Sequence, residues 1–266
     1  MKNITLLFSF LLLLVFSACN SGININTGFG TKTVGNGNVV TENRDANENF
    51  QKLIASGSVS VFLKQGEEQN IEVEAEDNIL PHIITEIKNN ELKIKTEGNL
   101  STEIGYTVYV TYVNLNSLKT SGSSFATIES TLSDDVINVI TSGSSDVKVK
   151  SIESNEVTII SSGASDIEID NVQSDKITLD TSGASDVKII GETKEFVGTH
   201  SGSSDLHGKN LKTKHAKIHT SGSSDVKISI EESLEAKSSG SSNIYYYGNP
   251  SKVEKNSSGS SSITQN

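Results

Sequence analysis

Five aspartates recur at nearly regular intervals, each three residues after a glycine: Asp146, Asp166, Asp186, Asp205 and Asp225. Carboxylates are hard oxygen ligands, so a column of them could form a calcium-binding stripe. Alternatively, each aspartate hydrogen-bonds to the backbone of its own turn, and lysines beside the column relieve its charge. Those lysines are Lys148, Lys188 and Lys227. Their interleaving, and the lack of a glycine-rich nonapeptide of the calcium-roll type, favour the second interpretation. We expect neither a metal nor a cofactor.

A second group that could do chemistry is formed by four histidines: His200, His207, His215 and His219. On an extended strand, His215 and His219 would lie roughly 13 Å apart, too far to share one ion. His200 has the inward parity of its strand, whereas the other three have outward parity. The pattern therefore predicts ordinary surface and interior residues rather than a metal site.

The only run of aromatic residues is Tyr245, Tyr246 and Tyr247. Alternation predicts that Tyr246 points inward and that Tyr245 and Tyr247 are exposed. Exposed tyrosines offer contact area at low entropic cost, so these two residues are candidates for a contact surface. The favoured interpretation is structural: an aromatic plug that closes the last part of the fold.

Catalysis on polysaccharides is a minor alternative. Such enzymes need clustered carboxylates with a basic partner, and aromatic platforms for sugar rings. The chain has no Trp, its single arginine is Arg44, and its aspartates are evenly spaced. We expect a protein that is not an enzyme.

The elements that must position these residues follow from a repeat of about 20 residues. Its fixed point is a glycine: Gly122, Gly143, Gly163, Gly183, Gly202, Gly222, Gly240 and Gly259. Apolar and polar residues alternate on both sides of each glycine, which is the pattern of strands. Identical short strands stacked in parallel satisfy both the period and the alternation. The sequence therefore predicts an all-β, single-domain parallel β-helix.

Each glycine is expected to form a corner between two strands, because glycine tolerates a positive φ and close approach of the next coil. Serine two residues after the glycine, and serine or threonine two before it, have inward parity and should form hydrogen-bonded columns, the second one interrupted by His200. Gly57 belongs to the same set. The 65 positions between Gly57 and Gly122 correspond to about three more coils.

The N-terminal segment has the layout of an export signal. Lys2 precedes an apolar run that ends before Cys19, and the sequence Phe-Ser-Ala-Cys is similar to a lipoprotein acylation site. We expect a signal peptide over residues 1–18, lipidation of Cys19, a Gly/Asn/Thr-rich tether over 19–42, and a folded domain over 43–266. The alternative for the tether is that its segments SGININ and GNVV add a first strand to the domain. Within that domain, residues 43–118 would form irregular first coils, with a turn at 88–90, and residues 119–266 the regular repeats.

Charge narrows the class of partners. The formal net charge is −11, with 22 basic and 33 acidic residues. A nucleic acid or an anionic membrane surface is therefore a poor partner, whereas calcium or a cationic surface is compatible.

These features together resemble the bacterial family of auto-transporter adhesin, head GIN domain proteins. The resemblance rests on the region from Asn43 to Gly98, on the repeated Ser-Gly-Ser-Ser-Asp corners and on the closing segment IYYYGNPSKVEKNSSGSSSI. It covers roughly residues 43–264 and implies a right-handed β-helix in an exported, often lipid-anchored protein. It carries over no catalytic residues.

The function predicted from sequence is a non-catalytic lipoprotein of the cell envelope. It would be anchored by lipid, most simply at the outer membrane, and act as an adhesin or binding module for a protein or glycan ligand. The alternative is a structural or envelope-stress component that faces the periplasm. The ligand and the oligomeric state stay open.

Overall fold

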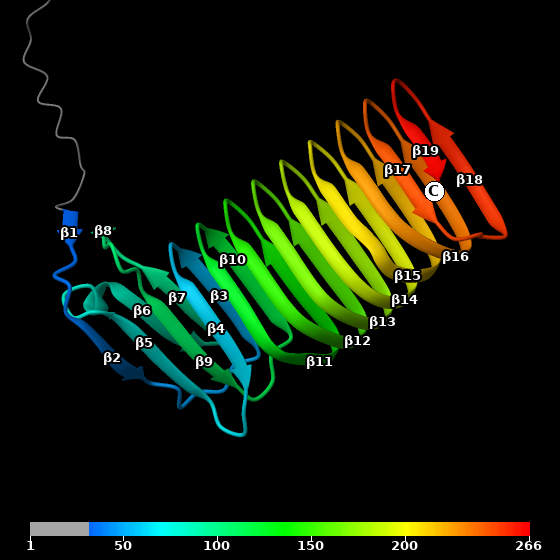
Figure 1. The fold of residues 1–266 in the computed structure, drawn as a ribbon. Coiled ribbons are helices and arrows are strands. Elements are labelled where there is room, and N and C mark those ends of the chain that lie inside the picture. The colour runs from blue at the N-terminus through cyan, green and yellow to red at the C-terminus, as the bar shows by residue number, and fades with distance from the viewer. Residues whose placement is uncertain (1–31) are drawn as a thin grey trace, which may run out of the picture.

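The computed structural model describes residues 32–266, and the predicted signal peptide and Cys19 lie outside this range. Its centre is a stack of long strands, each of which makes one coil. These strands are β11 (Phe125–Thr141), β12 (Asp146–Ser161), β13 (Asp166–Thr181), β14 (Asp186–His200), β15 (Asp205–Thr220) and β16 (Asp225–Ser238). Each pairs in parallel with the next, about 20 residues further along, as in Val147 with Ile167. The predicted parallel β-helix is confirmed (Figure 1).

The final turns are shorter. They consist of β17 (Asn243–Tyr247), β18 (Lys252–Ser257) and β19 (Ser262–Gln265). Strand β18 pairs with β16, and β19 pairs with β17. Within the described chain no further strand covers β18 and β19, and every side chain of β18 is exposed.

The first coil of the stack is built by β3 (Lys52–Gly57) and β4 (Ser60–Gln65). Strand β3 pairs in parallel with β10 (Ser117–Gly122), and Gly57 lies directly opposite Gly122. The two corners are therefore stacked neighbours. The expectation of about three coils between them was wrong, because the intervening residues pack on the side of β3 and β4 that faces away from β10.

The residues between these two corners form a cap over the N-terminal end of the stack. They contain β5 (Asn70–Glu76), the short 3-10 helix η1 (Leu80–His82), β6 (Ile83–Lys88), β7 (Glu91–Thr96), β8 (Asn99–Ser101) and β9 (Thr107–Tyr112). Strands β7 and β9 continue the parallel stack beneath β3 and β4. Strands β5 and β6 then pair antiparallel with β9 and β7. The β6–β7 hairpin turns at Asn89 and Asn90, both with positive φ, which confirms the predicted turn.

The ordered fold begins earlier than residue 43. Strand β1 (Lys32–Val34) pairs in parallel with β8, and β2 (Val39–Arg44) pairs antiparallel with β5. Asn36 and Asn38 donate hydrogen bonds to the carboxylate of Asp77, at 2.5 and 2.7 Å. This corrects the predicted tether, since its described part contributes strands: the edge of β5 offers unpaired backbone groups, which β2 satisfies.

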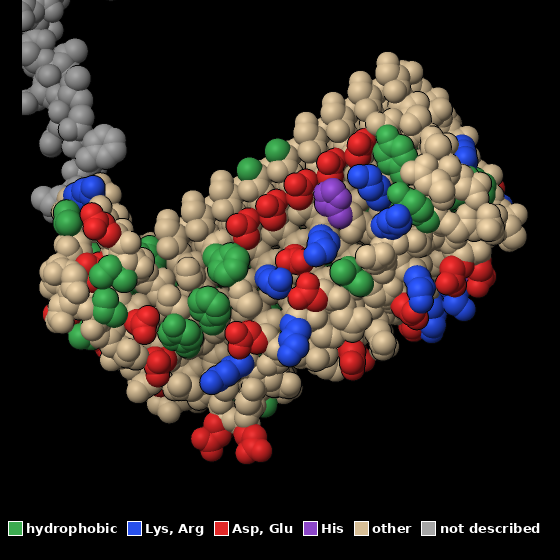
Figure 2. All heavy atoms as spheres, viewed as in Figure 1, with side chains coloured by type: hydrophobic (Ala, Val, Ile, Leu, Met, Phe, Trp, Pro, Cys, Tyr) green, Lys and Arg blue, Asp and Glu red, His purple; other side chains and the backbone are tan. Residues whose placement is uncertain are grey.

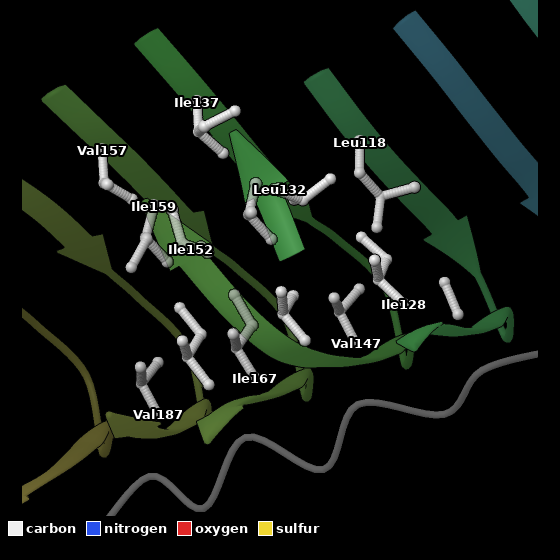
Figure 3. Packing of buried hydrophobic residues seen from close by; sticks show 14 of the residues in the cluster. Leu118, Ile128, Leu132, Ile137, Val147, Ile152, Val157, Ile159, Ile167 and Val187 are labelled. Atoms are coloured by element: carbon white, nitrogen blue, oxygen red, sulfur yellow. The ribbon is translucent and has the colours of Figure 1, made fainter. Parts of the chain in front are cut away.

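The interior is a thin column of aliphatic side chains that follows the predicted alternation. Val147, Val149, Ile167 and Ile169 are all almost fully buried, and equivalent positions stack on them from coil to coil (Figure 3). Each such side chain stabilises the fold by about 1.5–3 kcal/mol through burial. Because adjacent coils contribute the same residue types at the same positions, the outward-facing residues also form straight columns along the stack. Of the residues described, no helix is long or apolar enough to cross a bilayer.

Candidate functional site

The glycine corners place the outward columns in register. All eight predicted corner glycines, and Gly57, have positive φ. At Gly183, where φ is +83°, a Cβ atom would lie 2.3 Å from the carbonyl oxygen of Gly163. The N–H of Ala184 donates to that same carbonyl, at 2.7 Å. The corner therefore has no room for a side chain, and successive coils are held in fixed register.

Two columns of hydroxyl groups line the inside of the corners. Serine two after the glycine is buried in each regular corner through Ser242, and its hydroxyl donates to the carbonyl three residues back, as from Ser145 to Ser142 at 2.7 Å. In the other column the hydroxyls bond between coils, as in Thr141 to Ser161 at 3.0 Å. These hydroxyl groups are buried inside the stack and are not accessible to a ligand.

His200 interrupts the second hydroxyl column and is fully buried. Its Nδ1 lies 2.8 Å from the hydroxyl of Thr181, and its Nε2 has no hydrogen-bond partner among the described residues. Space for the ring comes from Gly198, where a Cβ would lie 2.9 Å from Nε2. Burial lowers the pKa of His200 to about 4, so the ring is neutral near pH 7.

The five predicted aspartates form a straight column on the outer face just after the corners. Their pairing is direct, as in Asp166 with Asp186 and Asp186 with Asp205. We call Asp146, Asp166, Asp186, Asp205 and Asp225 the aspartate ladder. Figure 2 shows a row of acidic side chains along this face. The column ends at Phe125 on one side and at Asn243 on the other.

The hydrogen bonds of the aspartate ladder run between coils. The carboxylate of Asp205 accepts from the backbone N–H of Asp225 at 2.9 Å, and that of Asp166 accepts from the N–H of Asp186 at 3.4 Å. The expectation that each aspartate bonds to its own turn is thus replaced by a bond to the next coil. In a parallel stack, the nearest free N–H is the one directly above.

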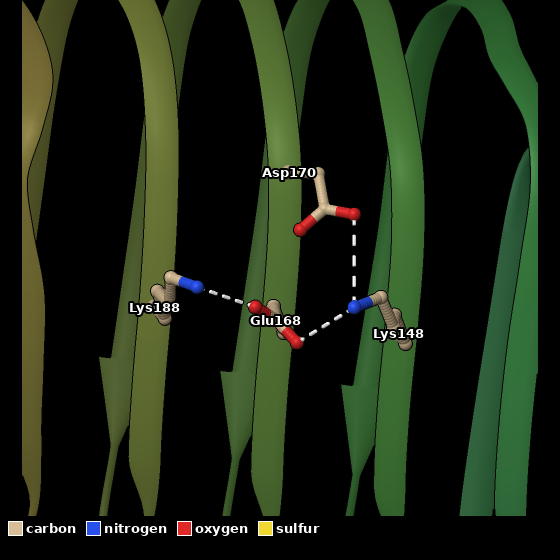
Figure 4. A network of polar contacts seen from close by, with 4 residues as sticks. All are labelled: Lys148, Glu168, Asp170 and Lys188. Carbon is tan, nitrogen blue, oxygen red and sulfur yellow. Dashed lines mark hydrogen bonds and ion pairs between the residues drawn. The ribbon is translucent and has the colours of Figure 1, made fainter.

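The lysines beside the ladder do not neutralise it. Lys148 and Lys188 both pair with Glu168, and Lys148 also approaches Asp170 at 3.8 Å (Figure 4). Among the described residues none of the five aspartates forms an ion pair. Burial, together with the charges of Asp166 and Asp205, raises the pKa of Asp186. Both lysines pair with Glu168 because it lies directly between them in the same column of outward-facing residues.

One set of metal-ligand atoms is brought together on this face. Atoms of Asp186, Asp205 and His207 lie within 4.8 Å of one another, and among residues 32–266 this is the one such group of three. The histidines do not converge: His200 is buried, and His215 lies 2.9 Å from Ser233. Two carboxylates and an imidazole at the surface could hold a divalent cation, but the aspartates alone do not define a site.

The tyrosines near the last turns are engaged within the fold. Tyr246 is buried, and the ammonium of Lys255 lies 4.6 Å from its ring centre. Tyr245 and Tyr247 are half-buried, and Lys209 covers the ring of Tyr247 at 4.7 Å. The two candidate contact residues are therefore less exposed than alternation predicts.

A cluster of exposed aromatic side chains at the other end of the aspartate ladder was missed from the sequence. The rings of Phe62 and Tyr109 stack with centres 5.8 Å apart and planes at 24°, and Phe125 meets Phe62 edge-on at 6.4 Å. Tyr109 and Phe125 are 39% and 38% exposed, which is unusual for large aromatic residues. We call Phe62, Tyr109 and Phe125 the aromatic patch. Figure 2 shows hydrophobic side chains gathered beside the end of the acidic row.

The signal for this patch was present in the alternation. Phe62 and Tyr109 have outward parity in strands that otherwise alternate cleanly, and Phe125 takes the corner position that aspartate takes in the next coil. What the sequence did not reveal is that β9 lies beside β4. That pairing sets Tyr109 directly opposite Phe62.

A groove of about 440 Å³ lies beside the stacked pair. It runs over the outer face of β4, β9 and β5, where Tyr109 is flanked by Phe62 on one side and Glu72 on the other. Its charged and amide side chains are Lys64, Asn70, Glu72, Glu74 and Glu129. The groove therefore combines two aromatic faces with three carboxylates and one ammonium group.

Comparison with known proteins identifies relatives of the whole fold. The chain matches the family described as "Putative auto-transporter adhesin, head GIN domain" over residues 49–169 and again over 141–250, more than half of its length. No curated protein matches it.

Several solved structures share the fold at low sequence identity. An adhesin described as putative from Parabacteroides merdae has a TM-score of 0.84 at 18% identity, over 88% of this chain and 99% of its own. One from Parabacteroides distasonis has a TM-score of 0.82 at 20% identity, over 88% and 100%. Another protein from that species, described as a "Putative lipid binding protein", has a TM-score of 0.80 at 18% identity, over 88% and 100%.

Proposed function

Because the chain belongs to the auto-transporter adhesin, head GIN domain family, we propose that it is a non-catalytic adhesin of the cell envelope that binds through its aromatic patch. The family itself indicates a protein of the cell envelope or surface. Anchoring by lipid at Cys19, with the outer membrane as its site, is part of this proposal. The ligand is a protein or a glycan.

The observation that carries the proposal is a group of three adjoining aromatic rings at the surface of a rigid stack, two of them exposed and one half-buried. Tyr109 and Phe125 are each more than one-third exposed, and Phe62 lies between them. Aromatic side chains are enriched where proteins make contacts, because they bury large areas at little entropic cost. The aspartates, by contrast, are spread evenly along the stack rather than focused on one groove, which favours binding over catalysis.

The test is removal of the patch with substitutions that the stack already tolerates. Thr127 occupies the position above Phe62 in the next coil, so Phe62→Thr and Tyr109→Thr should preserve the fold. The full chain, purified in detergent and labelled, would be applied to arrays of peptides, matrix proteins and glycans. The double variant should lose the ligands that the wild type binds, with unchanged thermal unfolding.

The matched control is Tyr245→Thr, which removes a half-buried tyrosine far along the same face. Thr264 takes that position in the last turn, so this change is also compatible with the stack. Equal binding by wild type and the double variant would refute the proposed contact surface. Loss of binding in the control alone would move the contact surface to Tyr245.

The location has its own test. An epitope-tagged copy would be exposed to protease on intact cells and on cells with a permeabilised outer membrane. Cleavage on intact cells supports the adhesin, whereas protection until permeabilisation would replace it with the periplasm-facing structural role. Cys19→Ala should release the protein from the membrane fraction.

A further inference from the structure

The groove beside the aromatic patch carries an excess of negative charge. Glu72, Glu74 and Glu129 line it together with a single cation, Lys64. Within the described chain, none of these four residues takes part in an ion pair. Elsewhere on the molecule several exposed glutamates are paired with a neighbouring lysine, as Glu192 is with Lys212 at 2.9 Å. The groove carboxylates therefore remain free to bind a cation from outside.

The register of the strands places one of these carboxylates beside an aromatic face. In the antiparallel pair of β5 and β9, Glu72 lies directly opposite Tyr109, and Tyr109 lies directly opposite Phe62 in the parallel pair of β9 and β4. Residues directly opposite in a sheet have Cβ atoms about 5 Å apart. A cation above the stacked rings would thus lie within reach of a carboxylate.

Other tyrosines of the same protein show what such a ring attracts. Lys209 covers the ring of Tyr247 at 4.7 Å, and Lys255 covers that of Tyr246 at 4.6 Å. Within residues 32–266, no such cation lies over Phe62 or Tyr109, although both rings border the more acidic surface. A cation over an aromatic face gains stabilisation that a neighbouring carboxylate reinforces.

We propose that this groove binds the side chain of an arginine or lysine in an extended, basic segment of a partner protein. The inference rests on the proposed function and names the ligand of the same contact surface. The guanidinium or ammonium lies over Tyr109 and Phe62 and donates charge-assisted hydrogen bonds to the carboxylates of Glu72 and Glu74. A segment that continues past Phe125 reaches the aspartate ladder at Asp146, the residue paired with Phe125, so further basic residues meet further carboxylates.

Charge distinguishes this ligand from the others that an aromatic surface could take. A neutral glycan would use the rings but gains little from three carboxylates held without counter-ions. An anionic polymer or membrane would be repelled by a chain of net charge −11. A basic polypeptide uses both the rings and the charges.

The test measures binding of a fluorescent peptide to the full chain in detergent by anisotropy. The peptide carries two arginines among glycines and serines, and its matched control replaces both with citrulline, which keeps the shape and removes the charge. The arginine peptide should bind about tenfold more tightly than the citrulline peptide, and its affinity should fall with added salt.

Matched variants separate the groove from general electrostatics. The affinity for the arginine peptide should fall by about tenfold or more in the triple variant that combines Glu72→Gln, Glu74→Gln and Glu129→Gln. The control variant removes the same charge elsewhere, through Glu153→Gln, Glu156→Gln and Glu231→Gln, three exposed glutamates outside the groove. Its effect should stay within about twofold.

The outcomes distinguish the inference from the function on which it rests. Equal binding of the citrulline peptide, or equal weakening by both triple variants, would overturn the inference. Binding of a neutral hexasaccharide that Phe62→Thr with Tyr109→Thr abolishes, without binding of the arginine peptide, would also overturn it and leave the proposed contact surface intact. Failure of the full chain to bind any array component would remove the proposed function itself.

Discussion

The regular coils from residue 119 onward and the N-terminal region of residues 32–118, which includes the cap, are built by different means. In the coils, each strand pairs with a near copy of itself, and the outward residues repeat as columns. In the cap, β5 and β6 run antiparallel and bring together residues from separate parts of the sequence. The coils therefore supply length and register. The cap sets an aromatic residue, Tyr109, directly between Phe62 and a carboxylate, Glu72.

The sharpest way to break the regular coils is to fill a corner. Gly183→Val combines strain at a φ of +83° with a Cβ placed 2.3 Å from the Gly163 carbonyl. We expect a loss of stability of about 4 kcal/mol, measured by urea unfolding.

A glycine near the N-terminus of the described chain gives the control for that experiment. Gly37 has a φ of +81°, but nothing lies within 4 Å of its would-be Cβ. Gly37→Val should therefore cost about 1 kcal/mol, from backbone strain alone. Equal losses for the two variants would show that the stacked carbonyl contributes nothing.

The buried histidine gives the next largest effect and depends on pH. In the unfolded chain His200 takes up a proton near pH 6.5, whereas in the folded chain it does so only near pH 4. The unfolded state therefore binds more protons between these values, and stability falls as the pH decreases through them. Between pH 7 and pH 4, the free energy of unfolding of the wild type should fall by up to about 3 kcal/mol more than that of His200→Thr.

The comparison is between slopes of unfolding free energy against pH, so the different packing of threonine does not enter it. Threonine already occupies this column at Thr181 and Thr220. His215→Thr, in an exposed position, is the matched control. Parallel slopes for wild type and His200→Thr would contradict the assigned pKa.

The ion-pair column gives a smaller effect. Glu168→Gln removes the shared partner of Lys148 and Lys188, and the pairs are solvent-exposed. The expected loss is about 0.5–1 kcal/mol in low salt, and it should disappear in about 1 M salt because exposed pairs are screened. An undiminished loss in high salt would indicate packing rather than charge.

Substitution in the aspartate ladder should give the smallest change in stability, and the change should be a gain rather than a loss. The pKa of Asp186 is raised, so its charged form is disfavoured in the folded state, and this contribution destabilises the fold as the pH rises through the pKa. Asp186→Asn should stabilise the protein by about 0.3 kcal/mol at pH 7 and leave it unchanged below about pH 3. A loss at pH 7 would show that the charge of this carboxylate is not net repulsive in the folded state.

Local pattern was sufficient to predict the repeat. Alternation on either side of Gly143 or Gly163 identified the buried positions, the strands and the stacking, because one residue type recurs wherever the same environment recurs. The inward parity of His200 and Tyr246 followed from the same rule, and both are buried.

Pairings between unlike segments could not be read in this way. Nothing local places β9 beside β4, or β2 beside β5, so the aromatic patch was missed and a tether was preferred to a strand before residue 43. The prediction that Lys148 offsets the charge of the aspartate column was wrong for a related reason. Which carboxylate a lysine reaches depends on its side-chain conformation, and Lys148 reaches Glu168 in the next coil of its own column. Periodicity predicts columns, whereas the chemistry of the groove depends on the strand order of the cap.

The stacking of Gly57 on Gly122 also bears on how the molecule folds. Their contact closes a loop of 65 positions, whereas each later corner meets its neighbour after about 20. The longer closure costs about 1 kcal/mol more in chain entropy. Coils can therefore add to one another by short steps, as in other repeat proteins, and we expect docking of the cap to be the slower event. A chain stalled before that event has a finished rod and no groove, so the time to first binding would report the last stage of folding.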